Sequence, residues 1–391
     1  MKYCTKCVSV DVSASPLSFD NEGVCTGCKV ASEKNNIDWD SRKEKLKKLV
    51  QEYKSNSDYD ILIPVSGGKD SYYQTHFAIH ELGLKPLLVT YHGNRYLEEG
   101  EYNLNRMREV FDCDHIIFRP STSVLIRLNR LAFKLHGDMN WHNHAGIETF
   151  PLKTAVNFKV PLVMWGEHGG LDLSGMFSLK DVVEYTKKYR LEHALHGYDW
   201  YDWTDEGVEK HGRPDLKEGL TDKDLQWAKH PTDEEIISSG MRGIYLGNFV
   251  SWDANYHVKL VKELYNWQES KNEFERTYRR FSNLDDMHEN GIHDYLKFIK
   301  FGYGRGTDHA CKDIRSGRMT REEGIEMVKK YDHVKPKKDL TNWLNYVDMD
   351  EKEFDIIADT FRDKRVWSVE NNEWVKENIW GGKSSYGRIK V

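Results

Sequence analysis

The sequence predicts an α/β protein with a parallel central sheet, a small cysteine-rich unit before it and a mostly helical C-terminal region after it. Short apolar segments alternate with segments of helical spacing between residues 60 and 166, which is typical of a parallel sheet with helical crossovers. Four of the six cysteines fall within the first thirty residues as two Cys-x-x-Cys pairs. Capping boxes at Thr320 and Asp350 predict the late helices Arg321–Lys330 and Glu351–Phe361.

The two N-terminal cysteine pairs are Cys4 with Cys7 and Cys25 with Cys28, and seventeen residues separate them. This spacing matches that of a zinc ribbon. Each pair places two thiolates on one side of a turn, and two such turns complete a tetrahedron. We therefore predict a structural Zn²⁺ site within a ribbon over residues 1–36. Two disulfides are the alternative, but nothing in the sequence indicates the oxidising compartment that they need.

A candidate phosphate-binding loop follows the first predicted strand, Asp60–Val65, to which a linker helix over residues 37–57 leads. The loop residues are Ser66, Gly67, Gly68, Lys69, Asp70 and Ser71. Helical spacing follows, so free backbone amides and the helix dipole favour an anion there, and the glycines let a phosphate approach closely. Asp70 would repel a phosphate unless a metal bridged them, which indicates Mg²⁺. A serine-glycine turn without a ligand is the alternative.

Four further segments are predicted to be strands, with helices expected over Glu98–Val110, Ser121–Leu135 and Tyr256–Trp267. The strands are Lys85–His92, His115–Phe118, Val160–Gly166 and Gly243–Phe249. Ligands bind beyond the C-terminal ends of parallel strands. We therefore expect Thr90 and Gly166 to contact ATP, and Glu167 to ligate Mg²⁺ or orient the substrate. A loop acid without a role is the alternative for Glu167.

Two polar stretches are candidates for the substrate site. Residues 178–230 are rich in acids, tyrosine, tryptophan and histidine, and we interpret them as an insertion that covers the mouth of the site; a solvated excursion is the alternative. The glycine-rich stretch Phe301–Arg318 is expected to be a loop, in which arginines suit phosphate or carboxylate recognition. Its candidate binding residues are Arg305, Asp308, His309 and Arg315. A basic solvated loop is the alternative.

The remaining segments carry weaker signals. Trp141–His144 is interpreted as a loop with hydrogen-bonded surface histidines rather than a metal cluster. The tail Trp367–Val391 is polar and contains glycine, which is typical of a mobile end. The predicted domains are the ribbon, the linker helix, a nucleotide-binding domain over 58–260 that carries the insertion, and a helical region over 261–391 that completes the substrate site.

Five segments together resemble one family. They are the cysteine pairs, VSGGKDS, VPLVMWGE, YLGNFVSWD and KFGYGRGTDHACKDIRSGRMTREEG. This combination resembles the N-acetyl sugar amidotransferase family, acetamidino-forming enzymes of bacterial surface sugars within the PP-loop ATP-pyrophosphatase superfamily. The resemblance covers nearly the whole chain, and FGYGRGTDHA…DIRSGRMTREE is its most specific part. It implies a Rossmann-like PP-loop domain of the HUP type.

The resemblance implies an ATP-dependent C–N ligase of bacterial polysaccharide, LPS O-antigen or nonulosonic-acid biosynthesis. Such an enzyme adenylates the acetamido oxygen of an N-acetylated, nucleotide-linked sugar and replaces that oxygen with ammonia, releasing AMP and pyrophosphate. Lys69, Asp70 and Glu167 are then the expected catalytic residues. Trp252 and Asp253, within YLGNFVSWD, are expected to contact the substrate together with the Phe301–Arg318 residues.

The source of the ammonia is predicted to lie outside this chain. A cysteine-type glutaminase needs a nucleophilic cysteine with a histidine partner. Only Cys113 and Cys311 remain after zinc is assigned, neither lies in a nucleophile-elbow context, and the chain does not begin with Met-Cys. We therefore expect a synthetase subunit that receives ammonia from a separate glutaminase. By resemblance, that partner is similar to the glutaminase and cyclase-like subunits of histidine biosynthesis.

Composition excludes other classes of function and leaves two rivals. The net charge of −6 gives no basic field for nucleic acid, no apolar run can span a bilayer, and MKYCTKC is not a signal peptide, so we expect a cytoplasmic protein. One rival is a tRNA-thiolating PP-loop enzyme, which needs a basic surface and a catalytic cysteine pair after the loop. The other is a non-catalytic nucleotide-binding regulatory subunit, against which the intact loop argues.

Overall fold

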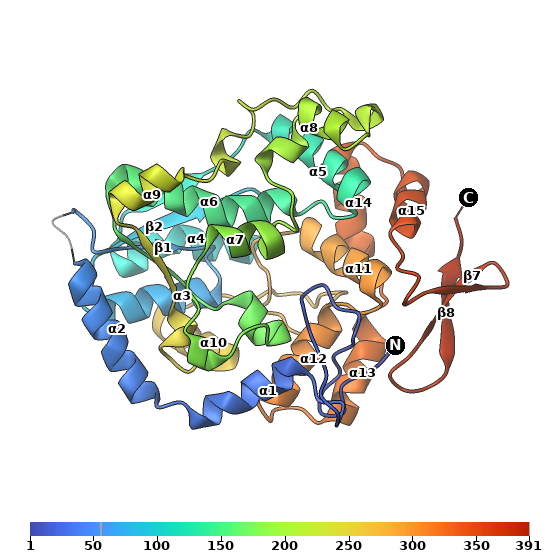
Figure 1. Cartoon of the computed structure of the whole chain (residues 1–391), viewed down its shortest axis with the longest axis horizontal. Helices are drawn as coiled ribbons and strands as arrows, with labels where there is room; N and C mark the ends of the chain where they lie inside the picture. The colour runs from blue at the N-terminus through green and yellow to red at the C-terminus, as the bar shows by residue number, and fades with distance from the viewer. Residues whose placement is uncertain (55–56, 391) are drawn as a thin grey trace.

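The computed structural model describes residues 1–54 and 57–390 and contains a five-stranded parallel sheet, whose strands β1 and β2 are labelled on the left in Figure 1. The strands are β1 (Ile61–Pro64), β2 (Pro86–Tyr91), β3 (His115–Phe118), β4 (Leu162–Trp165) and β5 (Arg242–Tyr245). Their order is β3-β2-β1-β4-β5, and every neighbouring pair is parallel. The predicted fold class is confirmed. The last strand ends at Tyr245 instead of Phe249, because Leu246–Asn248 turn into a 3₁₀ helix.

Both faces of the sheet are buried, as the apolar strands predicted. Alternate side chains of β1 point to opposite faces: Ile61 and Ile63 pack in a core with residues of α2, α3, α4 and α10, whereas Leu62 packs against α6. The helices that follow each strand therefore supply the two outer layers. Crossing from β1 to β4 reverses the direction in which the sheet grows, which places a ligand crevice at the C-terminal ends of these two strands.

Fifteen α-helices are present in the described residues. They are α1 (Thr26–Glu33), α2 (Trp39–Tyr53), α3 (Lys69–His76), α4 (Glu98–Phe111), α5 (Thr122–His136), α6 (Trp141–Phe158), α7 (Lys187–Tyr189), α8 (Asp205–Lys210), α9 (Asp233–Ser239), α10 (Ala254–Tyr265), α11 (Glu289–Phe301), α12 (Arg305–Arg315), α13 (Arg321–Tyr331), α14 (Lys337–Val347) and α15 (Glu351–Thr360). The predicted helices agree with α2, α4, α5, α10, α13 and α15 to within a few residues.

Two predicted loops are wrong, because each is helical. The stretch Phe301–Arg318 contains α12, which begins after Gly304. Its polar residues are buried in pairs instead of solvated; Thr307, for example, donates its hydroxyl to Asp332 over 2.6 Å. Trp141–His144 opens α6. His142 is buried and not at the surface, and its Nε2 lies 2.8 Å from a Glu289 carboxylate oxygen.

The two ends of the chain both pack against the helical C-terminal region. The N-terminal segment lies beside α12 and α13 (Figure 1), and Arg321 donates to the carbonyl oxygens of Cys4 and Cys7 over 3.1–3.2 Å. The tail was expected to be mobile, but it forms an antiparallel sheet of β6 (Ser368–Glu370), β7 (Glu373–Glu377) and β8 (Lys383–Arg388). Its anchor is aromatic, since Tyr386 packs on Phe298 with ring centroids 5.3 Å apart.

The insertion over 178–230 shares a core with the main domain, in which Trp203, Leu220 and Leu225 are buried against α5 and α6. The predicted domain boundaries stay predictions, and residues 55, 56 and 391 of the linker and C-terminal region fall outside the described residues. Within the described ranges, no helix is both long and apolar enough to cross a bilayer.

Candidate active site

The loop between β1 and α3 has the geometry of an anion site. It joins the end of a buried strand to the N-terminus of a helix, as the sequence predicted. The backbone amide of Ser66 donates to Ser71 Oγ over 2.9 Å, and the indole of Trp267 donates to the Gly67 carbonyl over 3.0 Å. These bonds hold the loop in one conformation. The free amides of the first turn of α3 therefore point to one place, where the helix dipole adds positive potential.

The two loop glycines have different structural roles. Gly67 has a φ of +77°, and a Cβ there would lie 2.7 Å from the backbone of Leu104 in α4. Gly68 has an ordinary φ of −68°, and a Cβ there would meet only Ser66 Oγ, at 3.3 Å. Gly67 is thus required by the fold itself, whereas Gly68 leaves open space in front of the helix N-terminus.

The charged residues of the loop pair with each other. Asp70 Oδ2 accepts from the Lys69 ammonium over 2.6 Å, and Oδ1 lies 2.8 Å from His257 Nδ1 in α10. Burial raises the pKa of Asp70, but Lys69 and His257 outweigh it and hold that pKa below its usual value. Asp70 therefore stays ionised. A permanently ionised carboxylate at a phosphate loop is the type of oxygen donor that Mg²⁺ prefers.

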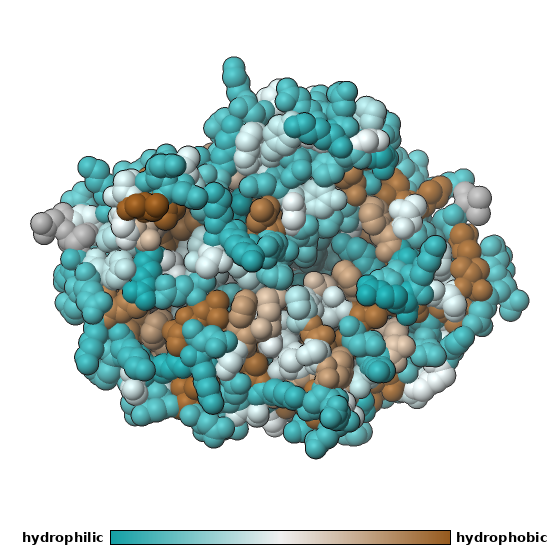
Figure 2. Space-filling view, viewed as in Figure 1, coloured by the Kyte–Doolittle hydropathy of each residue, from teal (hydrophilic) through white to brown (hydrophobic). Residues whose placement is uncertain are grey.

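A cavity of about 690 Å³ opens beside this loop. Figure 2 shows a mostly hydrophilic face that is hollowed near its centre. The cavity is lined by the ends of β1 and β4 with their loops, the segment from Ser9 to Leu17, and helices α6, α11 and α12. The insertion contributes Tyr189, His193, Ala194 and His196. Of the predicted site residues, six line it: Ser66, Ser71, Gly166, Glu167, Arg305 and Asp308.

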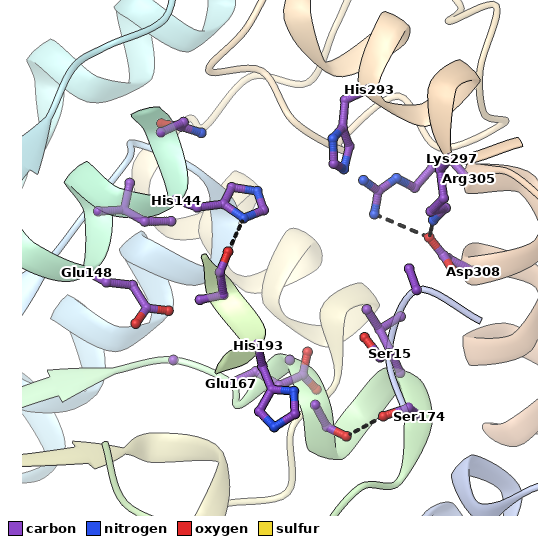
Figure 3. A pocket seen from close by; sticks show the side chains of 18 of the residues that line it. Ser15, His144, Glu148, Glu167, Ser174, His193, His293, Lys297, Arg305 and Asp308 are labelled. Atoms are coloured by element: carbon purple, nitrogen blue, oxygen red, sulfur yellow. Dashed lines mark hydrogen bonds and ion pairs between the residues drawn. The ribbon is translucent and has the colours of Figure 1, made fainter. Parts of the chain in front are cut away.

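One wall of the cavity is basic. Lys297 and Arg305 both pair with Asp308, and they face His144 and Glu148 across the cavity (Figure 3). Lys300, on the same wall, has no ion pair or hydrogen bond in the described part of the chain. Burial lowers the pKa of Lys300, and Asp138 partly restores it. An unpaired, partly buried ammonium favours an anion as its ligand.

Several predicted site residues lie away from this cavity. Thr90 is buried and uses its hydroxyl to bond the Val65 carbonyl over 2.6 Å. Trp252 packs edge-on against Tyr73, and Asp253 caps the N-terminus of α10. These side chains shape the region behind the loop and do not reach the cavity wall.

His309 and Arg315 also point elsewhere, because α12 turns them away from the cavity. His309 Nδ1 lies 2.5 Å from the Thr277 hydroxyl in a buried pair. Arg315 reaches the N-terminal unit, where it donates to Ser9 Oγ over 3.1 Å and contacts Cys25 Sγ at 3.5 Å. Neither side chain lines the cavity.

The GEHGG segment places its two polar residues on different sides. Glu167 lines the cavity, and its Oε2 accepts from Lys312 over 3.3 Å. His168 packs among Phe177, Tyr189 and Tyr245. Burial lowers the pKa of His168 to about 4, so this ring is neutral at pH 7.

The four N-terminal cysteines form a compact cluster. The Sγ atoms of Cys7 and Cys25 lie 3.6 Å apart, those of Cys4 and Cys28 lie 3.9 Å apart, and all four fall within 4.8 Å of one another. Sulfurs around a tetrahedral zinc with Zn–S bonds of about 2.3 Å lie about 3.8 Å apart. The donor set and spacing therefore fit one metal ion. No disulfide forms among these cysteines.

Other cavity residues were missed by the sequence analysis. They are His136, His144, Glu148, Tyr189, His193, His293, Lys297 and Lys300. Local sequence gave one usable signal: His144 and Glu148 are four residues apart, and on a helix this spacing places both on one face. Because Trp141–His144 was interpreted as a loop, this helical spacing was not recognised.

The candidate site lies at the C-terminal ends of β1 and β4, where the loop before α3 and helix α12 border one cavity. The C-terminal region identifies its relatives more closely. Residues 275–379 match the family model described as "LPS biosynthesis protein WbpG-like, C-terminal domain". The match includes the FGYGRGTDHA…DIRSGRMTREE stretch, which is the most specific part of the resemblance.

Solved structures with related folds are distant. An NH3-dependent NAD synthetase from Campylobacter jejuni is 14% identical over 52% of this chain and 95% of its own (TM-score 0.29). NMN synthetase from Francisella tularensis is 13% identical, covering 60% of this chain and 99% of its own (TM-score 0.27). The U34-tRNA thiolase NcsA from Methanococcus maripaludis, with its 4Fe-4S cluster, is 12% identical, covering 81% and 87% (TM-score 0.28). These low scores carry no functional argument. No match is found among curated proteins.

Proposed function

We propose that this chain is the synthetase subunit of an ATP-dependent sugar amidotransferase. It converts the acetamido group of an N-acetylated, nucleotide-linked sugar to an acetamidino group in surface-polysaccharide biosynthesis. One observation carries the proposal: the anion loop and the C-terminal family segment line the same cavity. A nucleotide held by the first can therefore react with a sugar held by the second. The volume of about 690 Å³ suits ligands of this size.

The first step would activate the acetamido group. An amide carbon is a poor electrophile because its oxygen is a poor leaving group. The amide oxygen attacks the α-phosphorus of ATP, an O–P bond forms, and the bond to pyrophosphate breaks. The amide N–H proton leaves to solvent, which gives a neutral O-adenylyl imidate. The backbone amides at the start of α3 and the hydroxyls of Ser66 and Ser71 would stabilise the charge that develops on the phosphates. When ATP binds, the Lys69 ammonium would leave Asp70 and donate to a phosphate oxygen instead.

Mg²⁺ would be held by carboxylates at the loop end of the cavity. Asp70 stays ionised beside the loop, where it pairs with Lys69 and His257, and Glu167 offers a second carboxylate on the cavity wall. When bound, the ion would neutralise charge on the leaving pyrophosphate. The chain's own residues would do the rest: they would align the sugar amide with the α-phosphorus, because positioning supplies much of the rate in such reactions.

The substrate would lie between the loop and the basic wall. Lys297 and Arg305 share Asp308, and Arg305 also pairs with Asp294. Lys300, near Asp138, makes no ion pair in the described residues, so its ammonium remains for a ligand. It suits the anionic part of a nucleotide-linked sugar. The acetamido end would then point to Ser66 and Gly166, where the α-phosphate of ATP is expected.

The nitrogen would come from a separate glutaminase. Within the described residues, neither remaining cysteine makes a hydrogen bond to a histidine: Cys113 Sγ bonds to the Phe111 carbonyl, and Cys311 Sγ lies 3.1 Å from Ser9 Oγ. The pair that would hydrolyse glutamine is thus not assembled. This supports a partner subunit, similar to those of histidine biosynthesis, as the source of ammonia.

Zinc is the proposed occupant of the cysteine cluster. The observed sulfur spacing fits one tetrahedral ion, whereas an iron–sulfur cluster holds its cysteine sulfurs further apart, because several irons and sulfides lie between them. Four thiolates leave no open position, so the ion would be structural. Arg315, beside Ser9 and Cys25, would offset the negative charge of the thiolates.

Pyrophosphate release tests the proposal. Purified chain, ATP and Mg²⁺ are incubated with N-acetylated nucleotide sugars and ammonium, and pyrophosphate and AMP are measured. We expect both products to depend on the sugar. ADP and phosphate would refute the mechanism, and release that depends on tRNA and a sulfur donor would indicate the thiolating rival. Tight ATP binding with no turnover for any sugar would favour a regulatory subunit.

A further inference from the structure

Glu148 presents an unpaired carboxylate to the cavity. It projects from α6, opposite the basic wall (Figure 3). Its Oε2 is buried and accepts no hydrogen bond from any residue that the structure describes. Burial raises the pKa of Glu148 to about 7, and Arg190 opposes this only in part. Burying a carboxylate without a partner costs free energy, so this arrangement indicates a ligand.

An aromatic wall lies beside this carboxylate. Trp165 at the end of β4, Tyr245 at the end of β5 and Tyr189 of α7 all line the cavity. The rings of Trp165 and Tyr245 have centroids 6.1 Å apart. Burial raises the pKa values of Tyr189 and Tyr245 most, and the negative charge of Glu148 raises them next. Both rings therefore lie near this carboxylate. Aromatic faces attract cations, and a single carboxylate adds one negative charge.

This combination selects a small monovalent cation with N–H donors. Mg²⁺ and Ca²⁺ take six or more oxygen ligands, and one carboxylate among aromatic rings cannot supply them. Ammonium needs one acceptor and gains from the ring faces. The anionic ligands, by contrast, are expected at Lys297, Lys300 and Arg305 on the opposite wall. Cation and anion sites are thus separated across one cavity.

We propose that Glu148 and the wall of Trp165, Tyr189 and Tyr245 receive ammonium, and that Glu148 takes its proton. The inference rests on the proposed function for its role in turnover. One N–H bond of ammonium breaks, its proton passes to the carboxylate, and the electron pair stays on nitrogen. The ammonia formed attacks the imidate carbon, a C–N bond forms, and the C–O bond to AMP breaks. All three hydrogens of ammonia stay in the amidinium product, and Glu148 returns its proton to solvent.

Other titratable groups surround Glu148 and enter the pH dependence. They are Arg190 beside it, Tyr185, Tyr189 and Tyr245 on the aromatic side, and Glu167, His144 and His193 in the cavity. Burial raises the pKa of each of the three tyrosines, that of Tyr189 to about 12, so they stay neutral. Burial lowers the pKa of His144. Glu148 is therefore expected to dominate near pH 7.

The kinetic test compares Glu148→Gln with Glu192→Gln, a matched change at an exposed carboxylate. Amidine formation is measured against total ammonium from about pH 7 to 9. For the wild type and Glu192→Gln, kcat/KM for total ammonium should level off above about pH 7, because the ionised Glu148 uses ammonium itself. For Glu148→Gln, kcat/KM for total ammonium should be about tenfold lower than in the wild type near neutral pH. It should then rise about tenfold per pH unit, because only free ammonia reacts. Glu148→Asp should restore part of the plateau.

A binding test does not depend on turnover. Ammonium chloride is titrated into the protein at constant ionic strength, balanced with sodium chloride, and tryptophan fluorescence is followed. A saturable change should appear in the wild type and disappear in Glu148→Gln and in Trp165→Phe. Glutamine is neutral and similar in shape, so Glu148→Gln should keep the wild-type melting temperature.

The outcomes separate the two proposals. If pyrophosphate release is normal but Glu148→Gln has the wild-type ammonium profile, the ammonium site is overturned and the proposed function stands. If no sugar supports pyrophosphate release, the proposed function fails, and the fluorescence titration still decides the site. An identical titration in wild type and Glu148→Gln would overturn the site in either case.

Discussion

Replacing Gly67 with alanine should damage the fold of the nucleotide loop. The residue has a φ of +77°, and a left-handed conformation costs a non-glycine residue about 1–2 kcal/mol. The new Cβ would also lie 2.7 Å from the backbone of Leu104, which cannot rotate away. Overpacking of this kind costs about 1–3 kcal/mol. The free energy of unfolding should therefore fall by about 2–5 kcal/mol, unless α4 moves.

Gly68→Ala is the matched control in the same loop. Its φ of −68° suits alanine, and its nearest contact is the Ser66 hydroxyl at 3.3 Å. Thermal unfolding should show a fall of about 4–10 °C for Gly67→Ala, at about 2 °C per kcal/mol, and almost none for Gly68→Ala. Calorimetry with ATP should show weaker binding for Gly68→Ala, because its methyl group occupies the space in front of the helix N-terminus. An unchanged melting temperature for Gly67→Ala would refute this account of the loop.

Three further predictions concern the ion sites. Asp70→Ala should reduce pyrophosphate release at least about a hundredfold with ATP still bound, since the ionised carboxylate opposite His257 is lost; full activity would exclude a role in catalysis. Cys25→Ser should lose zinc by elemental analysis and raise KM for the sugar, because the ribbon supplies Ser13 and its neighbours to the cavity wall; retained zinc would contradict the four-cysteine site. Arg315→Ala should weaken zinc retention against a chelator and leave kcat nearly unchanged. Arg305→Ala should instead lower kcat/KM. The reverse pattern would contradict the roles assigned to these two arginines.

The parts of the fold that follow local rules were predictable. Apolar runs bounded by turn residues located every strand of the parallel sheet, and Thr320 with Glu323 forms the predicted capping box of α13. The cysteine spacing located a compact thiolate cluster. These signals need no information from distant parts of the chain.

The parts that depend on distant partners were not predictable. Helix α12 is polar along most of its length, and its buried residues find partners far away in sequence: Asp313 pairs with Arg279, and Lys297 of α11 pairs with Asp308. Without these partners, the same residues predict a solvated loop. The tail formed strands for the same reason, since Tyr386 packs against Phe298.

The candidate site divides in the same way. The loop residues and Glu167 follow strands β1 and β4, so topology alone predicts that they lie at the C-terminal edge of the sheet. The basic wall and Glu148 come from helices α11, α12 and α6, and only the packing of these helices around the sheet brings them to one cavity. Their separation into a basic wall and an aromatic, acidic wall is a property of the structure that no single segment carries.

The most direct test of the central claim follows the acetamido oxygen itself. An N-acetylated nucleotide sugar is prepared with a heavy oxygen isotope in the acetamido carbonyl and is incubated with ATP, Mg²⁺ and ammonium. The account predicts that the label appears in AMP and that the sugar product is lighter by the exchange of O for NH. Label in inorganic phosphate, or label retained in the sugar after pyrophosphate has formed, would contradict adenylation of the acetamido group.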